Sequence, residues 1–215
     1  MVFSIFAVYN TTMGISERKE REKGEMKQLI MAAAMKMFLE DGYAKTSIRN
    51  IADSIEYSPG TIYLYYKDKD ELLYEVQRLA YGKMLEEFKK KATSVDPLER
   101  LEQMCKTYIT FGLENPELYD LMFIIRAPMN VDAEEHKDNG GDCFGFLMSC
   151  LEDCMKKDLL VFTDLNQAAL QVWAMGHGLV SLNIRCRLKI MISTDEAIRH
   201  TLNVSIEEYL KSIRK

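Results

Sequence analysis

Residues 46–66 read TSIRNIADSIEYSPGTIYLYY. In the first half of this stretch, the apolar residues recur at the spacing of one helical face, at Ile48, Ile51, Ala52 and Ile55. After a short turn, Ser58 supplies an N-cap and Pro59 the first residue of a second helix. Ile62 lies where it can pack against the first helix. The stretch therefore predicts two short helices joined by about three residues, a helix-turn-helix.

A helix-turn-helix places its second helix in the major groove of DNA. Gly60 and Thr61 are small enough to let that helix approach closely. Tyr63, Tyr65 and Tyr66 put hydroxyl groups beside it. Phosphates accept hydrogen bonds from such hydroxyls and from the N–H groups at the start of a helix. The residue types therefore favour binding of double-stranded DNA.

On both sides of this stretch, the sequence predicts helices, and no alternating pattern is long enough to predict a β-strand. Capping signals recur at Asp68, Asp96-Pro97, Asn115-Pro116, Thr163-Asp164 and Ser193-Thr194. Apolar residues recur at helical spacing, for example on a face of Leu29, Ala33 and Met37. We expect an all-α protein with helices near 17–40, 46–54, 58–65, 69–91, 97–113, 116–126, 141–158, 164–187 and 194–213. Asn130 to Asp142, rich in charge and glycine, is expected to be a loop.

Composition narrows the class of protein. The chain has 215 residues, of which 47% are hydrophobic and 28% charged, which excludes a disordered or fibrous protein. Five cysteines without a C-x-x-C pattern suit a reducing cytosol. The net charge is −5, unevenly distributed: residues 1–91 hold 15 Lys and Arg against 14 Asp and Glu, and residues 92–215 hold 13 against 19. An acidic total therefore does not exclude a DNA-binding amino-terminal part.

Two apolar segments raise the question of a membrane or a leader. Residues 2–9 are apolar but no basic residue precedes them, so they do not predict a secretory signal. Residues 1–12 are expected to be an extension or an arm that packs on a neighbour. Leu165 to Ile184 carries no charge, yet it contains several amides and His177, which lipid would have to desolvate. We expect a helix buried within the protein and no membrane partner.

The chain resembles the tetracycline-repressor (TetR) family of bacterial transcription regulators over roughly residues 25–75. The residues that carry the resemblance are in register: Phe38, Gly42, Thr46, Ile51-Ala52, Ser58-Pro59-Gly60, Tyr63, Tyr65-Tyr66, Lys69 and Leu72. Glu56 and Tyr57 depart from the family pattern in the turn, where glycine or asparagine and a small aliphatic residue are usual. A glutamate in the left-handed conformation would cost about 1 kcal/mol.

The resemblance implies an architecture and a set of DNA contacts. A three-helix DNA-binding domain at 17–72 would follow an extension at 1–16 and precede a larger effector-binding and dimerisation domain at 73–215. Thr46, Tyr63, Tyr65 and Lys69 would contact phosphates, and Ser58, Gly60 and Thr61 would face base edges. With neighbours added for charge and position, the candidate DNA-binding residues are Lys45, Thr46, Ser47, Arg49, Tyr57, Ser58, Pro59, Gly60, Thr61, Tyr63, Tyr65 and Lys69. A basic cluster at 18–23 is interleaved with glutamates, which favours a solvated helix start.

A homodimer is expected because one recognition helix seldom gives adequate specificity, and a two-fold pair reads two half-sites. Helix 164–187 is apolar on two sides, so one side can face its own core and the other a partner. The last helix carries a matching apolar stripe. The predicted four-helix interface comprises Val172, Met175, Leu179, Leu182, Ile198, Leu202, Ile206 and Tyr209.

An unidentified small-molecule effector is the third expected partner, since members of the family usually bind one in the larger domain. The residues Trp173 and His177-Gly178 resemble a signature of one TetR carboxyl-terminal subgroup. Residues that can line an apolar pocket are Tyr108, Phe111, Met122, Phe123, Phe144, Met148, Trp173 and His177. His177 can equally be a core histidine. Effector binding would shift the domains to an arrangement that no longer fits the operator, so a repressor is the expected outcome.

Other classes of function remain as alternatives. Cys143, Cys150 and Cys154 lie at helical spacing and would serve a thiol- or metal-responsive regulator, although buried inert cysteines are favoured. A DNA-independent helical interaction protein would account for the acidic charge and Glu56. No catalytic motif or phosphate-binding glycine loop is present, so we expect no enzyme, no cofactor and no metal.

Overall fold

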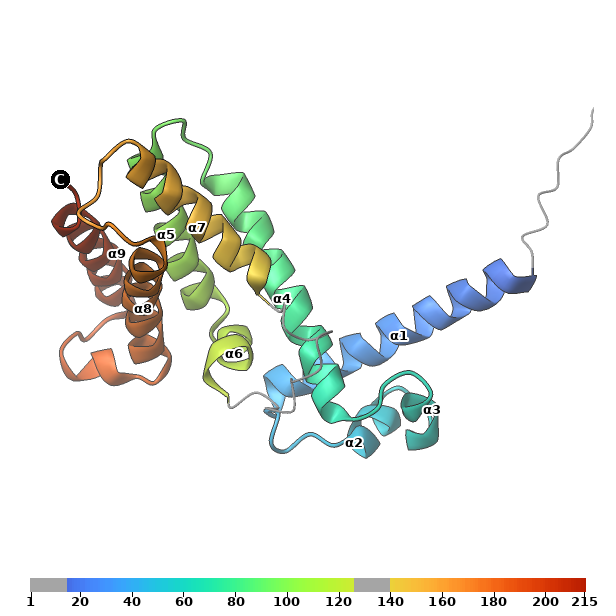
Figure 1. The fold of residues 1–215 in the computed structure, drawn as a ribbon. Helices are drawn as coiled ribbons and strands as arrows, with labels where there is room; N and C mark the ends of the chain where they lie inside the picture. Colours follow the sequence, from blue (N-terminus) through green and yellow to red (C-terminus); the bar gives the residue numbers. More distant parts are fainter. Residues whose placement is uncertain (1–14, 126–139) are drawn as a thin grey trace, which may run out of the picture.

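The computed structural model describes residues 15–125 and 140–215, and the regular secondary structure within them is helical apart from one isolated β-bridge between Leu160 and Arg214 (Figure 1). In chain order the elements are α1 (Ile15–Glu40), α2 (Ile48–Ser54), α3 (Pro59–Tyr63), α4 (Lys69–Lys91), α5 (Pro97–Glu114), α6 (Pro116–Tyr119), the π-helical turn η1 (Asp120–Ile124), α7 (Gly141–Lys156), α8 (Leu165–Ile184), the 3₁₀ turn η3 (Arg187–Ile190) and α9 (Asp195–Ser212). The predicted all-α fold class is confirmed.

Side-chain caps explain where most helices begin. Asp68, Asp96 and Asp164 each accept a hydrogen bond from the backbone N–H three residues on, as an N-cap does. At α9 the cap is Thr194 and not the preceding serine. Proline occupies the first turn of α3, α5 and α6, where no intrahelical donor is lost. These are the signals from which the helix starts were predicted.

The helical spacing of apolar residues predicted for α1 is confirmed, and the structure shows which of these residues are buried. The residues that pack inward are Ile30, Ala34 and Phe38, one position after the predicted face, while Leu29 is 43% exposed. The first part of α1 extends away from the rest of the molecule in Figure 1. Ion pairs within the helix, Arg18–Glu22 at 3.4 Å and Arg21–Glu25 at 3.5 Å, neutralise the basic cluster there. This agrees with a solvated helix start.

Two hydrophobic cores share one helix, α4. The smaller core joins α1, α2 and α3 to the start of α4, which contributes Leu72, Leu73 and Val76. The larger core joins α5, α7, α8 and α9 to the end of α4, which contributes Met84 and Phe88. Figure 1 shows α4 running from the small helices to the larger bundle. The two groups of helices are therefore joined by one continuous helix, and Leu121 of η1 adds a second contact with the smaller core.

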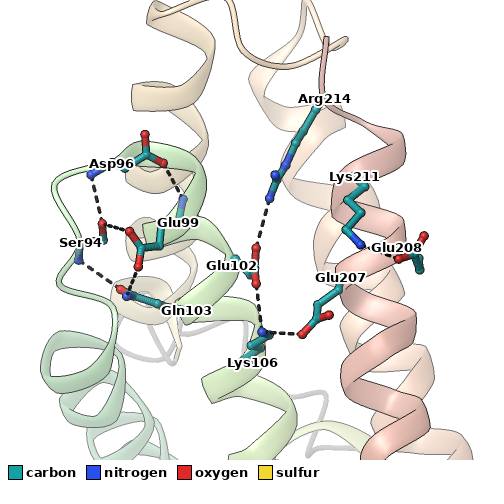
Figure 2. A network of polar contacts seen from close by, with 10 residues as sticks. All are labelled: Ser94, Asp96, Glu99, Glu102, Gln103, Lys106, Glu207, Glu208, Lys211 and Arg214. Atoms are coloured by element: carbon teal, nitrogen blue, oxygen red, sulfur yellow. Dashed lines mark hydrogen bonds and ion pairs between the residues drawn. The ribbon is translucent and has the colours of Figure 1, made fainter.

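Ion pairs fasten α9 to α5 along their outer side (Figure 2). The ammonium of Lys106 lies 2.9 Å from a carboxylate oxygen of Glu102 and 2.5 Å from one of Glu207. The guanidinium of Arg214 lies 3.1 Å from the other oxygen of Glu102. Because these side chains are half-buried and share partners, they form a network and not isolated surface pairs.

Two predicted helices end earlier than expected. In place of 116–126, α6 stops at Tyr119 and continues as η1, in which the N–H of Ile125 bonds to the carbonyl of Asp120. Side chains of α4 take two carbonyls of this wide turn: Gln77 donates to Leu121 O at 2.8 Å and Tyr81 to Met122 O at 3.1 Å. In place of 164–187, α8 stops at Ile184, because Cys186 adopts a left-handed φ of 56°.

Some expectations fall outside the described residues. The extension at 1–12 does so entirely, and the loop at 130–142 does so as far as residue 139. For the part of the chain that is described, none of the helices, α8 included, has the length and apolar character needed to cross a membrane.

Gly112 permits the close contact between α5 and α8. A Cβ at this position would lie 2.4 Å from Cγ1 of Val180 and 3.0 Å from Cδ2 of Tyr119. We predict that Gly112→Ala lowers the free energy of unfolding by about 1–3 kcal/mol, because the β-branched Val180 has little freedom to move away. Urea unfolding followed by circular dichroism measures this.

Gly82→Ala is the matched control, because Gly82 is an exposed residue within α4 with no atom within 4 Å of the added Cβ. That substitution should raise stability by about 0.5–1 kcal/mol through helix propensity. Equal effects of the two substitutions would contradict the steric account of Gly112.

Candidate nucleic-acid interface and effector cavity

The helix-turn-helix is formed by α2 and α3, and each helix has its own cap. Ser47 accepts from Asn50 N at 3.1 Å while Asn50 Oδ1 accepts from Ser47 N at 3.1 Å. Ser58 accepts from Thr61 N at 3.3 Å, and the two hydroxyls lie 3.1 Å apart. Ile51, Ala52 and Ile62 are fully buried between the helices. Burial on this side leaves the opposite side of α3 in solvent.

The turn between the helices passes through Glu56, whose φ is +61°. The N–H of Tyr57 bonds to the carbonyl of Ala52 at 3.0 Å, which closes α2 in front of the turn. The left-handed turn therefore forms with glutamate in a position where glycine would be unstrained. The departure from the family pattern therefore adds strain to the turn without preventing it.

Most of the predicted DNA-binding residues lie on the surface around α3. Tyr57 is 42% exposed and Tyr63 56%. Pro59, Thr61 and Tyr65 are half-buried. The remaining surface members of the predicted set are exposed: Lys45, Ser47, Arg49, Ser58 and Gly60. This face, from here on the α3 face, combines hydroxyl groups, two cations and small residues.

Thr46 and Lys69, for which phosphate contacts are predicted, also make structural contacts within the chain. Thr46 is 3% exposed, and its hydroxyl donates to the carbonyls of Gly42 at 3.0 Å and Met37 at 3.3 Å. The Lys69 ammonium donates to the carbonyls of Tyr43 at 2.8 Å and Thr46 at 2.9 Å, and it lies 4.0 Å from the centroid of the Tyr43 ring. Both residues fasten the loop after α1 to the start of α4.

Leu64 is a surface residue that sequence reasoning missed. It is 80% exposed at the end of α3. Helical spacing could have found it, because Leu64 follows Gly60 by four residues and Thr61 by three and so shares their face. An exposed leucine at this place adds an apolar group to the α3 face.

A cavity of about 320 Å³ lies between α4, α5, α7 and α8. Of the predicted pocket residues, Tyr108, Phe123, Phe144 and Trp173 line it. The described residues of the wall that were not predicted are Tyr81, Met84, Phe88, Met104, Gly140, Gly141, Cys143 and Leu147. Three of these residues, Tyr81, Met84 and Phe88, lie on one face of α4. The sequence predicted this helix but did not indicate that one of its faces lines a cavity.

The other four predicted pocket residues do not line this cavity. Phe111 borders a separate polar cleft beside Lys83 and Glu114. Met122 is in the larger core, and Met148 packs against that core from a half-buried position. His177 lies behind Tyr119, whose hydroxyl is 2.8 Å from His177 Nδ1. Periodicity could not separate these core positions from the cavity wall.

A chain of hydrogen bonds runs from the cavity wall into the core. Trp173 Nε1 donates to the Tyr108 hydroxyl at 3.3 Å, which lies 2.6 Å from the Tyr119 hydroxyl. Tyr119 then meets His177 Nδ1, and His177 Nε2 lies 3.1 Å from the Ser181 hydroxyl. Burial raises the pKa of Tyr108 to about 12 and lowers the pKa of His177, so every member of the chain is uncharged at neutral pH.

The cysteines near the cavity are buried thiols. Burial raises the pKa values of Cys143 and Cys154 to about 11, and the Cys143 thiol donates to the carbonyl of Tyr81 at 3.2 Å. Burial also raises the pKa of Cys150. Among residues 15–125 and 140–215, no three His, Cys, Asp or Glu side chains are placed to hold a metal ion. The geometry gives no support to a thiol- or metal-responsive site.

Half of the predicted dimer interface belongs to the core of the single chain. Val172, Ile198, Leu202 and Ile206 are at most 3% exposed, so the prediction that they face a partner is wrong. The surface of α8 and α9 presents the predicted Leu182 and two apolar side chains that were not predicted, Leu170 and Val204. Leu170 is 60% exposed, Leu182 46% and Val204 39%. Met175, Leu179 and Tyr209, which were predicted, are half-buried.

Models of two protein families match the chain. Residues 30–76 match the model described as bacterial regulatory proteins of the tetR family. Residues 101–204 match the model described as the carboxyl-terminal domain of tetracyclin repressor-like proteins. Together the two ranges cover more than half of the chain. The chain belongs to the TetR family.

Individual relatives of this TetR-family chain match over shorter ranges. An HTH-type transcriptional regulator of Haemophilus influenzae is 29% identical over 97 residues, which is 45% of this chain and 52% of that protein. The fatty acid metabolism regulator protein of Bacillus subtilis is 34% identical over 73 residues, which is 32% of this chain and 38% of that protein. The chain thus matches about half or less of the length of these curated relatives.

Solved structures share the TetR-family fold over most of its length. A tetR-family regulatory protein from Rhodococcus has a TM-score of 0.62 at 22% identity and covers 86% of this chain and 95% of its own. The fatty acid degradation regulator of Bacillus halodurans has a TM-score of 0.68 at 16% identity and covers 85% of this chain and 93% of its own. At these identities the likeness concerns the fold.

Replacing Lys69 should destabilise this TetR-family chain. We predict that Lys69→Met lowers the free energy of unfolding by about 1–3 kcal/mol, because two carbonyls lose a charged donor and Tyr43 loses its cation. Arg49→Met is the matched control, since the exposed Arg49 only meets Asp53 at 4.0 Å, and it should change stability by less than about 0.5 kcal/mol. Equal stability of wild type and Lys69→Met in urea unfolding would contradict the structural role.

The strain at Glu56 yields a prediction of opposite sign. Glu56→Gly should raise the free energy of unfolding by up to about 1 kcal/mol, because glycine adopts a φ of +61° without a Cβ clash. Glu56→Ala removes the same side chain but keeps the Cβ, and it should give no gain. Thermal unfolding of the two variants compares them, and a gain shared by both would assign the effect to charge and not to backbone strain.

Proposed function

We propose that this chain is a homodimeric DNA-binding transcriptional repressor that a small apolar effector releases from its operator. It acts in the cytoplasm and performs no catalysis. The observation that carries the proposal is the exposed α3 face on a helix-turn-helix, joined through α4 to a domain that contains an apolar cavity. The proposal keeps a DNA-binding domain at 17–72 and an effector domain at 73–215, and the two cores divide a few residues later within α4, between Val76 and Ala80.

The α3 face supplies both kinds of DNA contact. Ser58, Gly60 and Thr61 would face base edges, and Leu64 would contact a thymine methyl group in the major groove. Lys45, Arg49 and the Tyr63 hydroxyl would contact phosphates on either side, which positions the helix without reading sequence. Thr46 and Lys69 would act indirectly, because they hold the loop that carries Lys45 and Ser47.

A two-fold pair of chains would present two α3 faces to one operator. The exposed apolar side chains of α8 and α9 offer the contact: Leu170 and Leu182 lie on α8, Val204 on α9, and Met175, Leu179 and Tyr209 lie beside them. The small residues Ala174 and Gly178 lie between Leu170 and Leu182 at intervals of four, so two α8 helices can approach closely. The half-sites would then lie about one helical turn of DNA apart, or a multiple of it.

The cavity is connected to the DNA-binding domain through η1. Tyr81 and Phe123 line the cavity, and the Tyr81 hydroxyl also donates to the carbonyl of Met122 in η1. Leu121, the preceding residue of η1, packs in the smaller core and accepts from Gln77 of α4. An effector that displaces Tyr81 or Phe123 would therefore move η1 and α4 together. A shift of a few ångströms in the spacing of the α3 helices would favour the DNA-free state.

The test is a fluorescence-anisotropy titration of the DNA upstream of the encoding gene, at two salt concentrations and with unrelated competitor DNA. We predict that Arg49→Ala weakens binding to every sequence and reduces the slope of log affinity against log salt by about 1, because one phosphate contact is lost. Tyr63→Ala should weaken binding as well.

Lys156→Ala is the control for a loss of charge, because Lys156 lies at the end of α7 in the larger domain. It should leave both the affinity and the salt slope unchanged. If Arg49→Ala and Tyr63→Ala also bind as the wild type does, the α3 face is not the DNA-binding surface and the proposal fails.

A further inference from the structure

The cavity wall carries no charged side chain among its described residues. It is formed by aromatic rings, methionines, Leu147, two glycines and the neutral Cys143. Desolvating an ionised ligand in such surroundings is costly unless a charged or strongly donating partner meets it. The residues of the wall therefore disfavour binding of a charged ligand.

The polar hydrogens of the wall side chains already have acceptors. Tyr81 donates to the carbonyl of Met122, Cys143 donates to the carbonyl of Tyr81, and Trp173 donates to the hydroxyl of Tyr108. The Tyr108 and Tyr119 hydroxyls are hydrogen-bonded to each other, and the Tyr119 hydroxyl is also hydrogen-bonded to His177 Nδ1. When each tyrosine hydroxyl donates toward His177, the protons of Tyr108 and Tyr119 are both paired and His177 Nε2 donates to the Ser181 hydroxyl, whereas the reverse order leaves the Tyr108 proton unpaired at an apolar wall. A ligand thus meets oxygen lone pairs and not free donors.

Among the described residues of the wall, the backbone at the start of α7 is the remaining source of donors. Gly140, its N-cap residue, makes no side-chain capping bond, and both Gly140 and Gly141 border the cavity. A ligand oxygen can accept from the first-turn N–H groups there. The same turn carries the carboxylate of Asp142, which already complements the helix dipole. A neutral oxygen fits this place better than a second anion.

We infer that the effector is a small uncharged compound, mainly apolar, with at most a neutral oxygen such as an alcohol, phenol or ketone. The same argument disfavours a ligand that places a carboxylate against the described wall. The inference rests on the proposed function, because it names the ligand class of the cavity assigned there. The volume of about 320 Å³ lies at the lower end of the range for ligand sites, so the compound is small.

Trp173 is the only tryptophan of the chain and lies in the cavity wall, so its fluorescence reports occupancy without a label. Decan-1-ol and decanoate form a matched pair of probes, because both have ten carbon atoms but at pH 7.5 the alcohol is neutral and the carboxylate is anionic. Both are titrated into the full-length protein below their aggregation limits. We expect a saturable change in Trp173 emission with decan-1-ol and an affinity at least tenfold lower with decanoate.

Two variants at Phe144 test whether the probes occupy this cavity. Phe144 lies in the wall and is 40% exposed, so a longer polar side chain can be accommodated there. Phe144→Lys places a cation at the wall, and Phe144→Leu removes the ring without adding charge. We expect Phe144→Lys to bind decanoate at least tenfold more tightly than Phe144→Leu does, and decan-1-ol more weakly. Circular dichroism checks that both variants are folded.

The results test the ligand class, its location and the proposed function separately. Tighter binding of decanoate than of decan-1-ol by the wild type, or binding of neither, overturns the inference. Identical decanoate affinities of the two Phe144 variants overturn the location in the cavity. Operator DNA is titrated in parallel without any probe. Failure of that titration overturns the proposed function, and its success leaves the repressor standing whichever probe binds.

Discussion

The packing of α4 into two hydrophobic cores is the constraint on which the arrangement of the molecule depends. Residues from Leu72 to Val76 are buried with the helix-turn-helix, and residues from Ala80 to Phe88 are buried with the larger bundle. The helix has 23 residues and therefore spans about 34 Å. Neither core can lose its share of α4 without exposing apolar surface, so the two domains move as α4 moves.

Local signals made the fold predictable. Helix starts follow from side-chain caps and from prolines in first turns, and both depend on neighbours within four residues. The phase of a helix is less secure, because Leu29 and Ile30 are equally apolar. Only packing against α4 determines that Ile30 faces inward.

The site could be predicted only in part, for a related reason. Exposure of Tyr57, Ser58 and Tyr63 follows from their places in the turn before α3, at its N-cap and at its last residue. The carbonyl partners of Lys69 lie 26 and 23 residues earlier in the sequence, which no spacing rule reaches. In the same way, the apolar stripes of α8 and α9 did not reveal which stripe faces the core, since both are hydrophobic. The cavity wall combines residues of α4, α5, η1, α7 and α8, so only the assembled bundle reveals it.

The contact between Gly112 and Val180 also limits how the sequence can change over evolutionary time. The backbone of α5 approaches Val180 so closely that no side chain fits at position 112. A larger residue there requires a smaller one at position 180, or a wider separation of α5 and α8 that would open the larger core. Relatives that keep this helix pair should therefore vary at the two positions together, with the combined side-chain volume nearly constant.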